Sequence, residues 1–177
     1  PASEASGCCL ALGQALIDAG LPAGVLSILT GSSVPMVGQL IESPVIRKVS
    51  LTGSVPIGKE ILRRCAEGVK KVTLELGGHA PVIVHADFDP VAAAEKLAAT
   101  KYRNCGQVCI SPSRFYVHSS NYREFEDAFA AHARKLVIGD GLSKEVTTGP
   151  LVRRSALDHA LALIEDAQNS GARLVTG

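Results

Sequence analysis

Two short segments of the chain contain residue types suited to making and then hydrolysing a thioester. Glu75 lies in the segment 74–78, Leu-Glu-Leu-Gly-Gly, and Cys109 ends the segment 104–109, Asn-Cys-Gly-Gln-Val-Cys. A cysteine thiolate is a strong nucleophile, and a carboxylate can activate a water molecule. We therefore take Cys109 as a candidate nucleophile and Glu75 as a candidate general base.

Both candidates also have a structural interpretation. Most glutamates are exposed, so Glu75 could simply end an apolar strand and point to solvent. Free cysteine is among the most buried residue types, so Cys109 could be an inert core thiol. Considered singly, each residue is better explained in this way.

A third segment, 52–58, reads Thr-Gly-Ser-Val-Pro-Ile-Gly between a predicted strand and a predicted helix. Glycine lets a ligand approach the main chain, and the free N–H groups of a helix's first turn attract phosphate. The segment departs from the usual GxGxxG pattern, and Ser54 could be no more than an N-cap. A pyrophosphate site and a plain turn both stay open.

Apolar periodicity predicts helices and strands in alternation along the chain. The expected helices are 3–19, 34–42, 55–65, 91–100, 122–136 and 153–170, and the expected strands are 25–29, 48–51, 71–76, 81–84, 114–118 and 173–175. This order is typical of an α/β fold with mainly parallel sheets covered by helices. The double glycine at 77–78 is the expected boundary between two domains, 1–76 and 77–177.

Composition excludes several classes of function. A net charge of +1, with both signs evenly mixed, argues against nucleic-acid binding. No apolar run approaches the roughly 20 residues needed to cross a membrane, so we expect no membrane partner and a cytoplasmic location. Five cysteines without CxxC spacing indicate neither a disulfide framework nor a metal site, and we expect Cys8, Cys9 and Cys65 to be small buried thiols.

The segments also resemble one family, the aldehyde dehydrogenase superfamily, and within it the succinate-semialdehyde dehydrogenase branch. The resemblance rests on the order and spacing of segments 19–25 with 30–31, 51–58, 72–78, 106–109 and 149–151. It implies that residues 1–76 are the second half of a Rossmann-type NAD(P)-binding domain. Residues 77–177 would be the first half of the catalytic domain.

The resemblance also implies roles for individual residues. Cys109 would attack the aldehyde to form a thiohemiacetal that passes hydride to NAD or NADP and becomes a thioester, and Glu75 would activate the water that hydrolyses it. Ser3 stands where NAD-preferring relatives carry a glutamate, which makes NADP plausible, although the adjacent Glu4 could restore the acid. The implied cofactor-binding residues are Ser3, Gly31, Gly53, Ser54, Val55, Pro56, Ile57, Gly58 and Leu76.

Arg103 matches the arginine with which the semialdehyde branch holds the far carboxylate of its substrate. A guanidinium binds a carboxylate bidentately, so we expect an ω-carboxylated aldehyde such as succinate semialdehyde or 2-oxoglutarate semialdehyde. A surface arginine is the alternative. Cys105 is either a small buried thiol or a partner that traps Cys109 as a disulfide under oxidation, provided that the two α-carbons lie within about 7 Å.

Several family segments have no counterpart in these 177 residues. They are a lysine before residue 1, an upstream asparagine, a later Glu-x-Phe-Gly-Pro segment and the oligomerisation strand. We therefore expect an internal fragment, inactive by itself, of an enzyme that forms homodimers or homotetramers when full length. The alternatives are a cofactor-independent cysteine hydrolase and a non-catalytic scaffold of the same fold.

Overall fold

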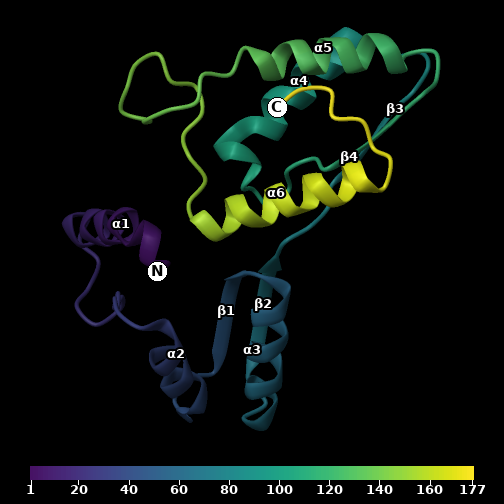
Figure 1. Cartoon of the computed structure of the whole chain (residues 1–177). Coiled ribbons are helices and arrows are strands. Elements are labelled where there is room, and N and C mark those ends of the chain that lie inside the picture. The colour runs from purple at the N-terminus through teal and green to yellow at the C-terminus, as the bar shows by residue number, and fades with distance from the viewer. The chain divides into compact units, whose positions relative to one another are not determined.

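The computed structural model describes residues 1–177, which divide into two compact units, Pro1–Leu76 and Gly77–Gly177 (Figure 1). Both units contain helices together with a strand-helix-strand motif, and both sheets are parallel. The predicted α/β class is therefore confirmed. Each unit is described by itself below.

The first unit is built around a strand-helix-strand motif. Its elements are a 3-10 turn η1 (Ser3–Ala5), α1 (Ser6–Asp18), α2 (Ser33–Glu42), β1 (Lys48–Gly53), α3 (Val55–Glu67) and β2 (Lys71–Leu76). Strand β1 pairs in parallel with β2, so that Lys48 lies opposite Lys71 and Gly53 opposite Leu76. A parallel pair needs a crossover connection, and α3 supplies it.

The core of the first unit lies between this sheet and helices α2 and α3. Ile41, Ile61 and Cys65 are its buried residues, and the inward-facing side chains of both strands pack against them. Exposed and partly buried positions alternate along β2, so Val72, Leu74 and Leu76 share the packed face while Thr73 and Glu75 lie on the exposed one. The period of two in the sequence thus decides which way Glu75 faces.

The second unit repeats the strand-helix-strand plan. Its elements are β3 (Pro81–Val84), α4 (Pro90–Tyr102), a 3-10 turn η2 (Arg103–Gly106), β4 (Arg114–Val117), α5 (Tyr122–Arg134) and α6 (Arg154–Asn169), and β3 pairs in parallel with β4. Val84, Ala93, Ala94 and Phe125 form the buried core. Asp89 caps α4 by accepting hydrogen bonds from the N–H groups of Val91 and Ala92, which satisfies donors that the helix itself leaves free.

Two predicted strands are wrong. Residues 25–29 and 173–175 have the apolar composition of strands but no regular structure. A β-strand exists through hydrogen bonds to a neighbouring strand, and neither segment pairs with one in this chain. The other predicted helices and strands are confirmed, with ends that shift by no more than three residues.

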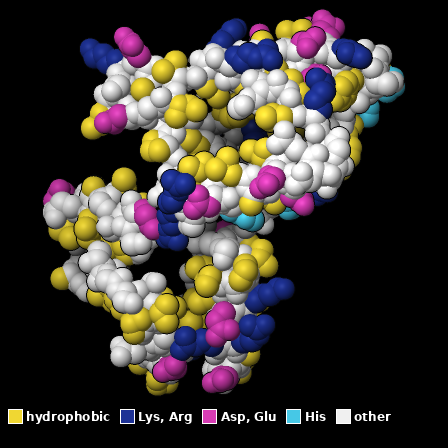
Figure 2. Space-filling model, in the orientation of Figure 1, with side chains coloured by type: hydrophobic (Ala, Val, Ile, Leu, Met, Phe, Trp, Pro, Cys, Tyr) yellow, Lys and Arg dark blue, Asp and Glu magenta, His cyan; other side chains and the backbone are white.

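Apolar side chains are also exposed on helices that lie at the edges of the two units, as the yellow areas of Figure 2 show. On α1, Leu12 is 62% exposed and Ile17 58%, and on α6 Leu161 is 52% exposed. The expectation of small buried thiols holds for Cys65, which is buried. It is wrong for Cys8, which is exposed on α1, and Cys9 is only partly buried. No helix of the chain is both long enough and apolar enough to cross a membrane.

Candidate functional site

The predicted residues of the first unit gather where β1 and β2 end. Glu75 lies opposite Thr52 and Leu76 opposite Gly53 in the parallel register, and Ser54 directly follows β1. The Glu75 side chain is exposed and has no hydrogen bond or ion pair with the rest of the chain. Its carboxylate is therefore free to bind a water molecule.

Helix α3 begins at this same end of the sheet. Ser54 occupies the N-cap position, but its side chain makes no capping hydrogen bond, and Pro56 in the first turn has no N–H to donate. The first intrahelical bond runs from the Gly58 N–H to the Ser54 carbonyl at 2.9 Å. The N–H groups of Val55 and Ile57 precede it, so the helix leaves them unpaired and exposed. Unpaired N–H groups at a positive helix end suit the pyrophosphate of a dinucleotide.

Gly58 lies where the first turn of α3 packs against the end of β2. A Cβ at this position would lie 2.9 Å from Cδ2 of Leu76 and 3.2 Å from Cδ1. The missing side chain therefore lets α3 approach the end of β2 closely. Gly58 connects the start of α3 to Leu76 through packing.

Ser3 and Gly31 lie on separate segments of the first unit. The Ser3 hydroxyl donates a 2.9 Å hydrogen bond to the Glu4 carboxylate, so serine and acid form one polar group. Gly31 has a φ of 141°, in the region that favours glycine, and adjoins the side chain of Met36. Gly31 is therefore required for its backbone conformation, and the Ser3 hydroxyl is already bonded to an acidic side chain.

In the second unit, three consecutive residues before Cys109 have left-handed backbone. The φ angles of Asn104, Cys105 and Gly106 are 52°, 55° and 72°. Only glycine adopts this region without steric cost, and a run of three is rare. Such backbone persists where the surrounding structure holds it, and it clusters at functional sites.

Hydrogen bonds hold this left-handed segment at both ends. Within it, the Gln107 N–H and side-chain amide both donate to the Asn104 carbonyl, at 3.0 and 3.1 Å, while the Asn104 amide donates to the Gln107 carbonyl at 3.3 Å. Across the unit, the Cys105 thiol donates to the Gly149 carbonyl at 2.7 Å, and the Val152 N–H donates to Gln107 Oε1 at 3.1 Å. We call residues 149–152 the brace, because they anchor the loop from outside.

Cys109 itself lies in a turn that closes with a 2.9 Å hydrogen bond from the Ser111 N–H to the Val108 carbonyl. Ser111 is buried, and its hydroxyl donates to the Lys101 carbonyl at 3.3 Å, which fixes the turn to the end of α4. Gly78 approaches so closely that a Cβ there would lie 3.2 Å from the Cys109 carbonyl oxygen. The Cys109 thiol is exposed, and its N–H makes no hydrogen bond in the chain.

Arg103 lines a cavity of about 290 Å³ beside this turn. Val108 and Ile110, the two neighbours of Cys109 in sequence, line the same cavity. Arg103 is exposed and makes no hydrogen bond or ion pair with the chain. Its guanidinium is therefore available to an anionic group in the cavity.

Sequence reasoning missed the residues that hold the left-handed segment 104–106 before Cys109. Gln107 appeared only as part of a motif, and segment 149–151 only as a point of resemblance. Asn and Gly in the run 104–106 signal left-handed backbone, but nothing local predicts that Cys105 bonds to Gly149, because the two residues are 44 positions apart.

The sequence pattern of the aldehyde dehydrogenase family matches residues 1–177. The chain is 44% identical to the glutarate-semialdehyde dehydrogenase of Pseudomonas aeruginosa and 44% identical to the NADP⁺ succinate-semialdehyde dehydrogenase of Escherichia coli, over all 177 residues. In both comparisons the whole chain is covered, and it spans 37% of the relative's length.

Solved structures agree with these relatives. The chain superposes on an NADP-dependent enzyme of E. coli with a TM-score of 0.96 and 44% identity, covering 100% of this chain and 37% of that one. For a succinate-semialdehyde dehydrogenase of Burkholderia pseudomallei the TM-score is 0.91 at 42% identity, with 95% and 35% covered. Together with the match along the whole chain, these similarities show that the protein belongs to the aldehyde dehydrogenase family.

Proposed function

We propose that this chain supplies the nucleophile and the general base of an NAD(P)-dependent aldehyde oxidation. The observation that carries the proposal is the setting of Cys109: an exposed thiol on a turn fixed to α4, next to a left-handed loop that hydrogen bonds hold in place. A structural thiol needs no such support, since burial alone accounts for it.

In the proposed reaction the Cys109 thiolate attacks the aldehyde carbon, and the carbonyl oxygen becomes an oxyanion. The unpaired N–H of Cys109 can donate a hydrogen bond to that oxyanion, which lowers the barrier. Loss of hydride from the thiohemiacetal carbon gives a thioester on Sγ. Glu75 then takes a proton from water, the resulting hydroxide attacks the thioester carbon, and the acid leaves as the thiolate is regenerated.

The residues at the start of α3 fit a dinucleotide cofactor. The unpaired N–H groups of Val55 and Ile57 and the uncapped Ser54 hydroxyl are the donors that would hold its pyrophosphate, while Gly53 keeps the approach open. Leu76, Gly31 and Ser3 complete the proposed cofactor residues. When bound, the nicotinamide supplies the hydride acceptor. Ser3 favours NADP because a hydroxyl can donate to a 2′-phosphate, whereas Glu4 beside it favours NAD.

For the substrate we propose an aldehyde with a carboxylate at its far end. Arg103 is unpaired in a cavity that Val108 and Ile110 also line, so a carboxylate bound there would extend from the neighbourhood of the thiol. The names of the relatives, glutarate-semialdehyde and succinate-semialdehyde dehydrogenase, describe aldehydes of this kind. A bidentate guanidinium-carboxylate pair would select them over uncharged aldehydes.

Since the chain spans 37% of these relatives, we propose that it acts as part of a longer, homo-oligomeric cytoplasmic enzyme and is inactive by itself. Within that enzyme, the first unit would hold the cofactor and Glu75. The second unit would hold Cys109 and the substrate.

The proposal is tested by intact-mass analysis of the full-length protein during turnover with NAD(P) and succinate semialdehyde. With Glu75→Gln we expect one acyl group to accumulate on Cys109, and steady-state turnover to fall about a hundredfold or more, because general-base catalysis contributes that much. Cys109→Ser should show neither adduct nor turnover.

Arg103→Gln tests the substrate class separately. We expect it to raise the KM for the carboxylated aldehyde while butanal oxidation stays unchanged. Full turnover in Glu75→Gln, or turnover of the wild-type protein without NAD(P), would overturn the dehydrogenase proposal. An unchanged preference in Arg103→Gln would overturn only the substrate class.

A further inference from the structure

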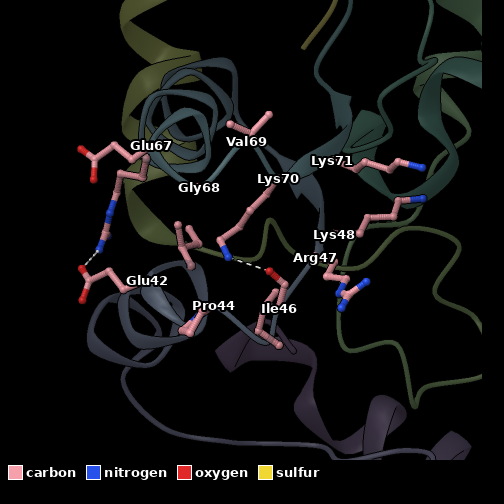
Figure 3. A pocket seen from close by; sticks show the side chains of 12 residues that line it. Glu42, Pro44, Ile46, Arg47, Lys48, Glu67, Gly68, Val69, Lys70 and Lys71 are labelled. Carbon is pink, nitrogen blue, oxygen red and sulfur yellow. Dashed lines mark hydrogen bonds and ion pairs between the residues drawn. The ribbon is translucent and has the colours of Figure 1, made fainter.

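A cavity of about 850 Å³ lies at the amino ends of β1 and β2, beside the ends of α2 and α3 (Figure 3). Each strand contains six residues, so roughly 16 Å separates this cavity from the carboxyl ends where Glu75 and Ser54 lie. The proposed function uses the carboxyl ends alone. The cavity at the other end has no role in it.

The lining of this cavity is strongly basic. Arg47, Lys48, Arg64, Lys70 and Lys71 face only two carboxylates, Glu42 and Glu67. Two helix C-termini also point here and would favour cations. A ligand can be bound only by those of the five cations that have no partner within the chain.

Two of the cations are already bound to the cavity wall, one by an acid and one by carbonyl groups. Arg64 forms an ion pair with Glu42 at 2.7 Å. Lys70 Nζ donates hydrogen bonds to the carbonyls of Ser43 at 2.7 Å and Ile46 at 2.6 Å. It thereby supplies donors for two backbone acceptors in the segment that follows α2. These contacts fix the wall and occupy one acid, the carbonyl at the C-cap of α2 and one carbonyl of the following loop.

Three cations remain, Arg47, Lys48 and Lys71, and their charged side-chain groups make no hydrogen bond or ion pair in the chain. Figure 3 shows them on one side of Lys70, with Glu42 and Glu67 on the other. Lys48 and Lys71 are directly opposite in the parallel register. Like charges at opposite positions of neighbouring strands destabilise the pair unless a counter-ion lies between them.

The rest of the cavity combines an apolar wall with a left-handed residue at the rim. Ile41, which is 3% exposed, lies with Pro44 and Ile46 on the α2 side. Val69 at the rim has a φ of 50° and is 90% exposed. This left-handed conformation closes the C-terminal end of α3, because the Val69 N–H donates to the Ala66 carbonyl at 3.1 Å.

We propose that this cavity binds a phosphate group, either free phosphate or the monoester of a small molecule, through Arg47, Lys48 and Lys71. A dianion with three or four acceptor oxygens matches one guanidinium and two ammonium groups. The cavity volume lies in the range of small-molecule sites and exceeds the space that inorganic phosphate needs. The apolar wall would contact the organic part of an ester.

The test is calorimetric titration of the full chain at constant ionic strength with inorganic phosphate and with phenyl phosphate. We expect saturable binding of at least one of them at a single site. The double variant Lys48→Gln with Lys71→Gln should weaken it about tenfold or more, because two charge-assisted contacts are lost. The control Lys135→Gln with Lys144→Gln removes the same charge from exposed lysines of the second unit and should leave affinity unchanged.

The two probes distinguish the sources of the phosphate group. Equal affinities would identify free phosphate as the ligand, and tighter binding of phenyl phosphate would identify an ester. The absence of saturable binding in the millimolar range, or an equal loss in the control variant, would overturn the proposal. So would NMR amide shifts that occur at Ser54 and Gly58 instead of Lys48 and Lys71. None of these outcomes bears on Cys109 or Glu75, so the proposed function stands or falls separately.

Discussion

The thiol of Cys105 donates a hydrogen bond to the carbonyl oxygen of Gly149, 44 residues further along the chain, over 2.7 Å. Cys105 is the middle residue of the left-handed run, so this bond acts directly on the segment 104–106. Together with the bond from Val152 to Gln107 it attaches the loop to the brace. The conformation of residues 104–107 is therefore tied to that of the brace.

Removing the thiol donor should loosen the loop. Cys105→Ala leaves the Gly149 carbonyl without its donor, at a cost of about 1 kcal/mol, and we expect kcat of the full-length enzyme to fall about fivefold with the KM for NAD(P) unchanged. Cys105→Ser keeps a donor and should restore most of the rate. Cys8→Ala, on exposed α1, is the matched control. Because an unfolded fraction would also lower apparent kcat at unchanged KM, circular dichroism must show that Cys105→Ala is fully folded at the assay temperature. A kcat equal to that of the wild type would contradict the prediction.

Gly106→Ala should destabilise the second unit by about 1–3 kcal/mol, because its φ of 72° suits glycine and a Cβ would lie 3.2 Å from the Lys101 carbonyl oxygen. Backbone cannot move aside as a flexible side chain can. Gly141→Ala, where a Cβ meets nothing within 4 Å, should be neutral. Urea unfolding measures the stability of both variants. Equal unfolding midpoints would contradict the fixed left-handed conformation of Gly106.

Gly58→Ala should lower stability by about 1 kcal/mol, since overpacking against Leu76 outweighs the better helix propensity of alanine. Because Leu76 must rotate away, we also expect weaker NADP⁺ binding, measured by fluorescence titration. Gly7→Ala on α1, with open space around it, should instead stabilise the chain by several tenths of a kcal/mol. An increase in stability for Gly58→Ala would contradict the close approach of α3 to β2.

Acid should release the C-terminal segment from α5. The Arg173 guanidinium donates a 2.5 Å hydrogen bond to Glu126 and holds the pKa of that carboxyl below its usual value. A carboxyl whose pKa is lower in the folded state contributes stability above its unfolded pKa of about 4.3, and this contribution is lost as the pH falls through the folded pKa. Thermal unfolding of Glu126→Gln should therefore depend less on pH below 5 than that of the wild type, by an amount that added salt reduces. Parallel pH profiles would disprove the linkage.

The sequence predicted most of the framework because its signals are local. Periodicity located β2 and β3 with the observed bounds, and the alternation along 71–76 already separates Glu75 from Leu74 and Leu76. The strands expected at 25–29 and 173–175 failed because composition records the preference for a strand but not the presence of a partner. Cys8 was misjudged for a similar reason, since burial depends on a neighbour that packs against the helix.

By itself, then, the sequence determined the α/β alternation, the family and the two residue types that suit thioester chemistry, since all of these depend on residue order and near-neighbour spacing. Only the tertiary structure decided that Cys105 and Gln107 bind the brace, and that Arg103 shares a cavity with the neighbours of Cys109. It likewise decided that Lys48 and Lys71 lie opposite each other. Such contacts join residues tens of positions apart, and they form only when packing of the core brings those segments together.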